Sequence, residues 1–165
     1  MSIALRPYLP QDTETLAAIF VASIETLAAD DYDVEQIAAW TATIDDQPTF
    51  GKRLAGQLTL VATVEAEIVG FASLKGADHI DLLYVHPQAA LQGVATMLCT
   101  ALEKLAQARG AQHLTADASD TAEPFFGKRG YVAQRRNTID LDGVWLANTT
   151  MKKMLAANDS KGNGP

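Results

Sequence analysis

The segment that decides the fold runs from Ile80 to Leu98 and has the sequence IDLLYVHPQAALQGVATML. An apolar stretch ends at Pro87, a loop containing Gly93 and Ala95 follows, and an aliphatic run comes next, an order typical of a strand, a tight turn and a helix. Gly93 permits a close backbone approach, Ala95 is small, and the first amides of a helix have no intrahelical partner. The segment therefore predicts an anion-binding turn at a helix start, although an ordinary strand-to-helix turn fits the same residues.

The residues on either side of this segment predict one mixed sheet. The first predicted elements are a strand at 3–8, a helix that opens at Pro10 and is capped by Asp12 or Thr13, and helices that start at Asp33 and near 50–54. A hairpin within 58–74 and a strand at 79–85 follow. The remaining elements are a helix at 93–109, a strand at 113–116, a helix at 121–128 and a hairpin of 131–141 and 144–151. A strand-loop-helix-strand unit within an antiparallel series predicts an α/β (α+β) fold with a mixed, mostly antiparallel seven-stranded sheet and helices on both faces.

Length and composition indicate one domain, residues 1–155, followed by a flexible tail at 156–165. The chain has 165 residues, of which 48% are hydrophobic and 20% charged, close to the average for folded globular proteins. The formal charge of -7 argues against a nucleic-acid partner, because neutralising phosphates requires a dense patch of Lys and Arg. An anionic cofactor would therefore be held locally, by backbone amides at a helix start.

Cysteine usage and the apolar runs suggest where the protein resides. Cys99 is the only cysteine, so no internal disulfide forms, and no Cys/His cluster with zinc spacing surrounds the three histidines, so we expect no metal. No apolar run approaches the roughly 20 residues of a membrane span, and the first residues lack a basic segment leading into an apolar signal core. We expect a cytoplasmic protein with no membrane partner.

Two motifs resemble the signature of the GNAT N-acetyltransferase superfamily. The first comprises Leu83-Tyr84-Val85-His86-Pro87 and Gln92-Gly93-Val94-Ala95, and the second comprises Ser119, Ala122, Phe125-Phe126 and Gly130-Tyr131. The order of elements agrees with the family over about residues 3–154. The chain is most similar to the YafP-like branch through HIDLLYVHP, DASDTAEPFFGKRGY and GVWLANTTM. The resemblance implies an enzyme that uses acetyl-CoA.

The family fold implies a particular place for acetyl-CoA. Its fourth strand bulges and splays from the fifth, which here are residues 79–85 and 113–116, and the exposed backbone binds the pantetheine arm. The amide of Val85 is the expected donor to the thioester oxygen, a contribution of about 3 kcal/mol to the barrier. The residues implied in cofactor binding are Leu83, Tyr84, Val85, Leu91, Gln92, Gly93, Val94, Ala95, Thr96, Ser119, Phe125 and Phe126.

Three positions depart from the family pattern. Ala90 occupies an Arg/Gln position and Leu91 a common Gly position, so binding of the diphosphate is expected to depend on the amides near Gln92 to Thr96. Phe126 stands where many members have the tyrosine that protonates the departing thiolate. Tyr131 and Ser119 are the nearby hydroxyls that could replace it. From the residues alone, Tyr131 fits a packed strand tyrosine equally well and Ser119 fits a helix cap.

The candidate base lies on the fourth predicted strand. His79 is nearest to the position where some relatives have a glutamate base, and Asp81, two residues along the strand, is expected to point to the same face and orient it. The alternative is a solvated His79 and an Asp81 paired with a loop donor. Cys99 lies among Met97 and Leu102 on a helix and is expected to be buried instead of serving as a nucleophile.

The acceptor side is implied to contain Tyr32, Trp40, Trp145 and Asn148, although tryptophans are more often core residues. The acidic residues Asp30, Asp31 and Asp33 either steer a cationic amine or cap a helix. The acceptor is a small-molecule or peptide amine that the sequence does not identify, and relatives often form homodimers.

Two other functions fit the sequence. One is a non-catalytic acyl-CoA-binding sensor module, and the other is an α/β nucleotide-binding protein, although the turn lacks the P-loop and dinucleotide patterns.

Overall fold

The computed structural model describes residues 2–156, and the tail expected beyond residue 156 lies outside the described residues. The helices are α1 (Thr13–Leu27), α2 (Val34–Thr41), α3 (Gln47–Ala55), α4 (Val94–Ala108) and α5 (Glu123–Lys128), with short 3-10 segments at Pro10–Asp12, Ala42–Ile44 and Pro87–Ala89. The strands are β1 (Ile3–Pro7), β2 (Leu58–Val64), β3 (Glu67–Lys75), β4 (His79–Val85), β5 (His113–Ser119), β6 (Val132–Leu141) and β7 (Val144–Met154).

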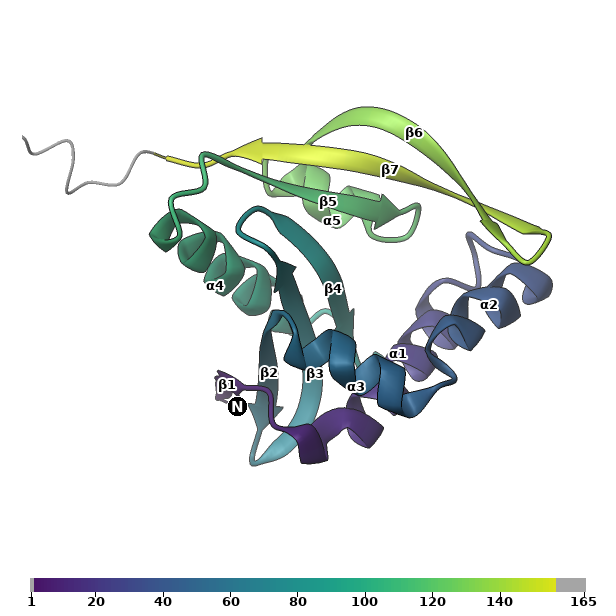
Figure 1. The fold of residues 1–165 in the computed structure, drawn as a ribbon, viewed down its shortest axis with the longest axis horizontal. Coiled ribbons are helices and arrows are strands. Elements are labelled where there is room, and N and C mark those ends of the chain that lie inside the picture. The colour runs from purple at the N-terminus through teal and green to yellow at the C-terminus, as the bar shows by residue number, and fades with distance from the viewer. Residues whose placement is uncertain (1, 157–165) are drawn as a thin grey trace, which may run out of the picture.

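The seven strands form one sheet in the order β1-β2-β3-β4-β5-β7-β6 (Figure 1). All neighbouring pairs are antiparallel except β4 and β5, which are parallel because α4 crosses between them. The predicted mixed sheet of seven strands is therefore confirmed. The strand expected at 113–116 extends to Ser119, and the last strand extends to Met154.

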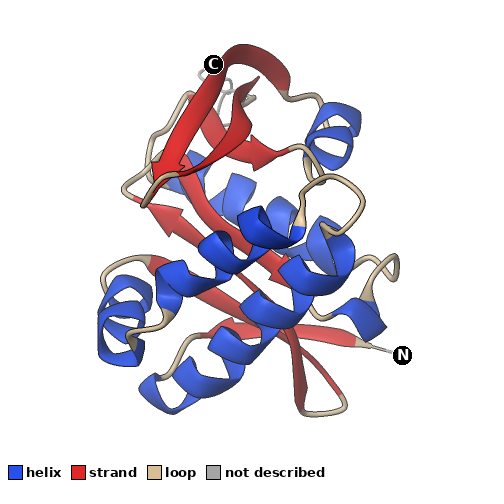
Figure 2. Cartoon of the chain, turned by 90° about the vertical axis from the view of Figure 1, so that its right-hand side faces the viewer, coloured by secondary structure: helices blue, strands red, loops and turns tan. Residues whose placement is uncertain are grey.

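Helices cover both faces of the sheet and produce two apolar cores (Figure 2). On one face, Leu98 and Leu102 of α4 pack with Leu74 of β3. On the other face, α1 and α3 contribute Phe20 and Phe50 to a cluster that includes Phe71 of β3, whose ring centroid lies 6.4 Å from that of Phe50. The alternation of side chains along β3 supplies both cores.

Side-chain caps explain where several helices begin. The Asp33 carboxylate accepts a hydrogen bond from the Gln36 amide at 2.8 Å, which confirms the capping alternative for this acidic residue. Asp12 occupies the cap position of α1, but its side chain makes no cap bond there. The Asp12 carboxylate binds the Arg6 guanidinium at 2.8 Å and accepts a hydrogen bond from the Leu9 amide at 2.8 Å, so it bonds a backbone amide at the 3-10 turn Pro10–Asp12 and not at the start of α1.

The pairing of β4 with its two neighbours creates a gap in the sheet. β4 pairs with β5 only at His79 with Thr115 and Ile80 with Ala116, and the two strands then diverge. The register with β3 shifts at the same place and leaves Asp81 as an extra residue, a β-bulge. The bulge reverses the alternation, so Ile80 faces the α4 core while Leu82 faces the other core. The sheet therefore opens at the middle of β4.

Two further properties concern the described residues 2–156 as a whole. None of the helices in this part of the chain has the length and apolar character needed to cross a membrane. Within the same residues, no three His, Cys, Asp or Glu side chains lie together in a group that could hold a metal ion.

Candidate active site

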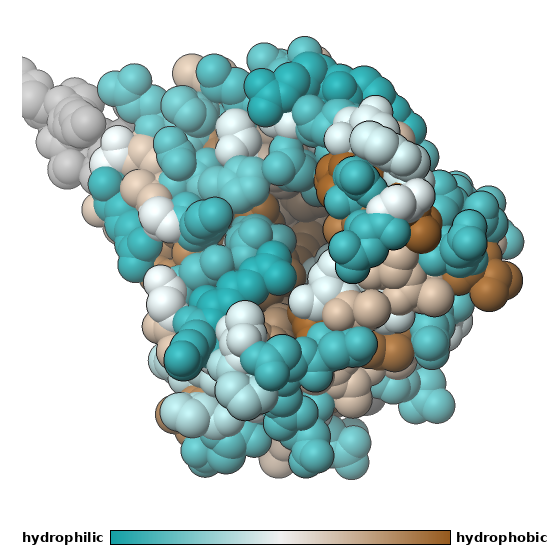
Figure 3. Space-filling model, turned by 45° about the vertical axis from the view of Figure 1, so that its right-hand side comes forward, coloured by the Kyte–Doolittle hydropathy of each residue, from teal (hydrophilic) through white to brown (hydrophobic). Residues whose placement is uncertain are grey.

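A cleft of about 380 Å³ lies where β4 and β5 separate, and Figure 3 shows it as a hollow with an apolar floor and a polar rim. Its volume is in the range of small-molecule sites, which is roughly 300–1,000 Å³. One wall is β4, from His79 to Tyr84, and the opposite wall is β5, from Ala116 to Ser119. Residues of α1, α2, α3, α5, β6 and β7, together with nearby loop residues, complete the lining.

Backbone groups on the open edge of β4 point into this gap. The amide of His86 donates to the carbonyl of Val69 on β3 at 2.8 Å. Neighbouring residues in a strand direct their amides to opposite edges, so the amide of Val85 points away from β3 and toward β5. Because β5 has already diverged, it does not pair with Val85. Val85 is buried and lies just outside the cleft lining, so its role as oxyanion donor stays a prediction.

The turn before α4 leaves the first amides of the helix without intrahelical partners. Gly93 has a φ of 89° and caps the helix by position, and the first helical bond runs from the amide of Met97 to the carbonyl of Gly93. The preceding amides at Val94 to Thr96 therefore have no partner within the helix. A Cβ built on Gly93 meets nothing within 4 Å, so the space in front of the turn is open. This geometry suits an anion.

Of the other residues implied in cofactor binding, some line the cleft and some do not. Leu83, Tyr84, Ser119 and Phe126 line the cleft. Phe125 does not line it and packs against the α4 core instead. Leu91 is fully exposed at a φ of 62°, a backbone conformation that favours glycine, which explains why a glycine is common at this position.

His79 lines the cleft and is held by β5. Its Nδ1 lies 2.8 Å from the Thr115 hydroxyl, and its Nε2 lies 3.8 Å from a carboxylate oxygen of Asp117. The Thr115 hydroxyl also donates to the carbonyl of Asp78 at 3.3 Å. The tautomer of His79 decides whether Thr115 donates to Nδ1 or accepts from it; when Nδ1 bears the proton, the lone pair of neutral His79 is on Nε2.

Asp81 does not orient His79, which corrects the expected pairing. One of its oxygens accepts hydrogen bonds from Arg53 Nε at 2.8 Å and Gln57 Nε2 at 2.9 Å. Burial alone would raise the pKa of Asp81, but these two hydrogen bonds outweigh it and hold the pKa below its ordinary value. The bulge explains the difference, since simple alternation along β4 no longer holds at Asp81. Asp81 stays ionised and anchors Arg53.

Tyr131 is also corrected, because its hydroxyl points away from the cleft. The Tyr131 side chain is buried and its hydroxyl donates to Glu103 of α4 at 2.8 Å. Burial, followed by the neighbouring Cys99 and Glu103, raises the pKa of Tyr131. Ser119 does line the cleft, and its Oγ accepts a bond from the Ala122 amide at 3.1 Å, the capping contact that was its alternative.

Cys99 is buried, as its neighbours on α4 predicted. Burial, reinforced by the Glu103 carboxylate, raises the pKa of the Cys99 thiol to about 11. The thiolate is the nucleophilic form of cysteine, and this environment suppresses it. Cys99 is therefore a packing residue.

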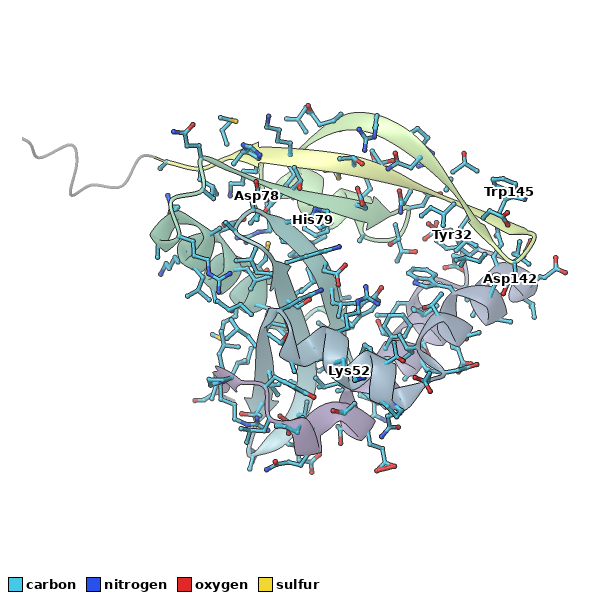
Figure 4. The ribbon with its side chains drawn as sticks, in the orientation of Figure 1. Tyr32, Lys52, Asp78, His79, Asp142 and Trp145 are labelled. Carbon is cyan, nitrogen blue, oxygen red and sulfur yellow. The ribbon has the colours of Figure 1, made fainter. Side chains whose placement is uncertain are left out.

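At the acceptor end, three of the four expected residues line the cleft and one does not. Tyr32, Trp40 and Asn148 are lining residues, and the rings of Tyr32 and Trp40 pack edge to face at 5.3 Å. Trp145 is outside the lining and 57% exposed. Figure 4 shows Trp145 beyond Tyr32, at the outer end of the β6–β7 hairpin. The buried neighbour Leu146 explains this, since adjacent strand residues face opposite ways.

Sequence reasoning missed several residues of this site. Thr115 and Asp117 lie two apart on β5, and both approach the His79 ring, so alternation along that strand was the available indication. Arg53 contacts Asp81 across 28 positions of sequence, which no local pattern reveals. Gly70 was also missed: a Cβ there would lie 3.0 Å from the carbonyl oxygen of Tyr84 and 3.0 Å from Val94.

The splayed parallel pair, the bulge in β4 and the open helix start together define an acyl-CoA-dependent acyltransferase fold. A sequence model of the acetyltransferase (GNAT) domain matches residues 28–155. The chain is 34% identical over 151 residues to the uncharacterized N-acetyltransferase YafP of Escherichia coli (strain K12), covering 92% of this chain and 95% of that protein. It belongs to the GNAT N-acetyltransferase family.

Solved structures agree with this membership. A GCN5-related N-acetyltransferase from Rhodopseudomonas palustris, described also as a class-II aminotransferase, is 62% identical with a TM-score of 0.92, over 94% of this chain and 97% of that one. The PaiA N-acetyltransferase of Thermoplasma acidophilum, solved with coenzyme A, is 20% identical with a TM-score of 0.77, over 93% and 99% of the two chains. The second comparison shows the shared fold.

Proposed function

We propose that this protein transfers the acetyl group of acetyl-CoA directly to an amine bound in the cleft. The observation that supports this most strongly is the separation of β4 from β5 after Ile80, which opens a cleft beside β4 and leaves the Val85 amide without a partner on β5. The related fold from Thermoplasma acidophilum binds coenzyme A. The non-catalytic sensor module is disfavoured because the cleft retains a histidine with a defined hydrogen-bond partner.

In this proposal the open turn at Gly93 holds the CoA diphosphate through the amides of Val94 to Thr96. The pantetheine arm then follows the open edge of β4 past Leu83 and Tyr84, and the Val85 amide donates to the thioester oxygen. Because this contact strengthens as negative charge develops on that oxygen, it favours the transition state over the ground state.

His79 is the proposed base. An attacking amine must be neutral, and Nε2 of His79 can accept a proton from it directly or through a water molecule while Thr115 holds the ring. The amine nitrogen then bonds to the carbonyl carbon, the carbon–sulfur bond breaks, and the sulfur leaves with the electron pair. Ser119 lines the cleft, and within residues 2–156 its hydroxyl accepts from the Ala122 amide but donates to no protein acceptor, so it is the proposed donor to that sulfur.

Replacing the base gives a specific prediction. His79→Ala should lower turnover mainly below neutral pH, because at high pH the amine is already neutral and needs no base. A loss of roughly 100-fold at low pH is expected for a general base. The measurement is thiol release from acetyl-CoA as a function of pH, followed with a thiol reagent.

His113→Ala is the matched control, because His113 at the start of β5 also lies beside an aspartate, 3.6 Å from Asp78, but does not line the cleft. An unchanged pH profile for His79→Ala would remove His79 from the base role. CoA binding without thiol release across a broad amine panel would contradict the transferase activity itself.

A further inference from the structure

The cleft contains a cation that the proposed catalysis does not use. Arg53 of α3 lines the cleft, and it is the one Arg or Lys among the described lining residues. Its side chain is 38% exposed, and its guanidinium binds Asp81 through Nε alone. Within residues 2–156 neither of its Nη atoms has a hydrogen-bond partner. The two terminal nitrogens are thus available to a ligand, while Nε fixes the plane of the group.

The anchoring of Arg53 favours a role beyond surface charge. Asp81, its partner, is 17% exposed and receives a second hydrogen bond from Gln57. A guanidinium held on one edge by a carboxylate loses little further freedom when its other edge binds a second carboxylate in the bidentate geometry that suits both groups. The contact would be made without the cost of ordering a long side chain.

The surroundings of Arg53 indicate what else the ligand contains. Phe20, Trp40, Tyr84 and Leu146 line the same cleft, so the body of the ligand meets apolar and aromatic surface. Asp81, which anchors the cation, is two residues from His79 on β4, a Cα spacing of at most roughly 7 Å, and Arg53 and His79 line the same cleft. A molecule with an amine and a carboxylate separated by a few bonds can span that interval.

We propose that the acceptor is an amino acid with an apolar or aromatic side chain, whose carboxylate binds Arg53 while its amine faces His79. This inference rests on the proposed transferase activity and specifies its substrate class. The carboxylate determines affinity and orientation, and the side chain occupies the apolar lining.

The test compares amines that differ only in the carboxylate. L-phenylalanine and 2-phenylethylamine form one pair, and L-leucine and isopentylamine form another. Thiol release from acetyl-CoA should show a higher kcat/KM for each amino acid than for its decarboxylated counterpart. Arg53→Met should remove this preference by lowering kcat/KM for the amino acids roughly tenfold to a hundredfold, mainly through KM, with little change for the simple amines.

Two control variants separate the guanidinium from its surroundings. Lys52→Met removes the neighbouring cation on α3, which Figure 4 shows on the same helix and which does not line the cleft, so the amino-acid preference should persist. Gln57→Met removes the other donor to Asp81 while keeping the guanidinium, and the preference should again persist. If Gln57→Met lost the amino-acid preference and Arg53→Met kept it, the preference would depend on Asp81 and not on the guanidinium, and the inference would be overturned.

The outcomes distinguish this inference from the proposed function. Faster acetylation of the simple amines than of the amino acids by the unmodified protein would overturn the inference and leave the transferase activity intact. A preference for amino acids that survives Arg53→Met would also overturn it. No thiol release with any amine would overturn the transferase activity, and the inference with it.

Discussion

The Glu103 side chain on α4 shows how single contacts set the properties of a residue. It accepts hydrogen bonds from the Tyr131 hydroxyl at 2.8 Å, from Arg129 at 2.9 Å and from Lys153 at 3.3 Å. Burial alone would raise the pKa of Glu103, but these donors outweigh it and hold the pKa below its ordinary value. A depressed folded-state pKa contributes stability above the unfolded pKa, and the contribution is lost as the pH falls through the folded value.

Tyr131→Phe is expected to destabilise the fold without reducing catalysis. It removes a hydrogen bond to a charged group, worth about 1.5–3 kcal/mol at pH 7, while the cleft keeps its lining. The loss should shrink at an acidic pH below the depressed pKa of Glu103, because the carboxylate is then protonated in both proteins. Urea unfolding at both pH values and turnover at saturating substrate test this.

Tyr8→Phe serves as a control for loss of a tyrosine hydroxyl, since Tyr8 bonds Thr13 at 2.6 Å and does not line the cleft. A large fall in turnover with unchanged stability in Tyr131→Phe would return Tyr131 to the general-acid role.

Among the elements, the contact between the first turn of α4 and the strands beneath it depends on Gly70 of β3. A Cβ at this position would lie 3.0 Å from the Tyr84 carbonyl oxygen and from a methyl group of Val94. Real Cβ atoms seldom approach so closely, so a larger residue must push α4 away from β3 and β4. The position of the turn before α4 relative to the Val85 amide therefore depends on the absence of a side chain at Gly70.

Gly70→Ala should destabilise the protein by about 1–3 kcal/mol, the usual range for overpacking a core, and should weaken CoA binding because the turn moves relative to β4. Thermal unfolding and CoA titration measure the two effects. Gly51→Ala, within α3, is the control: its new Cβ makes only ordinary contacts, the nearest 3.5 Å from Thr13, and the change should stabilise the helix by up to about 1 kcal/mol. Equal effects of both substitutions would contradict the proposed role of Gly70.

The elements also show what the sequence could and could not predict. Periodic apolar residues and local turn residues predicted every strand and the helices that cover the sheet, because these patterns act over a few residues. The bulge at Asp81 depends on pairing with β3, so alternation along β4 wrongly joined Asp81 to His79. The direction of the Tyr131 hydroxyl was equally hidden, since Glu103 lies on another element.

At the scale of the whole molecule, the cleft separates the strands β1 to β4 from the strands β5, β7 and β6, and the two parts contact each other at both ends of the cleft. At the closed end, β4 and β5 pair through two residues of each strand. At the acceptor end, the Tyr32 hydroxyl donates to the carbonyl of Ala147 at 3.0 Å and accepts from the Asp120 amide at 2.9 Å. Between these ties the strand edges are unpaired, so a ligand that fills the gap joins the two parts and stabilises the entire fold.

Coenzyme A is therefore expected to protect the protein against heat. At a concentration 100 times its dissociation constant it should add about 2.7 kcal/mol, which corresponds to roughly 5–10 °C for a chain of this size. ATP at the same concentration should protect much less, because it lacks the arm that lies between β4 and β5. Differential scanning fluorimetry gives both shifts.

Two glycine variants locate the origin of this protection. Gly93→Ala and Gly110→Ala place alanine at φ values of 89° and 88°, and in each case the new Cβ meets nothing within 4 Å, so both should lose a similar stability of about 1–2 kcal/mol. Gly93→Ala alone puts a methyl group where the diphosphate must approach, and it should reduce the CoA-induced shift while Gly110→Ala retains it. Equal protection by CoA and ATP, or a full CoA shift in Gly93→Ala, would show that the turn before α4 is not the CoA site.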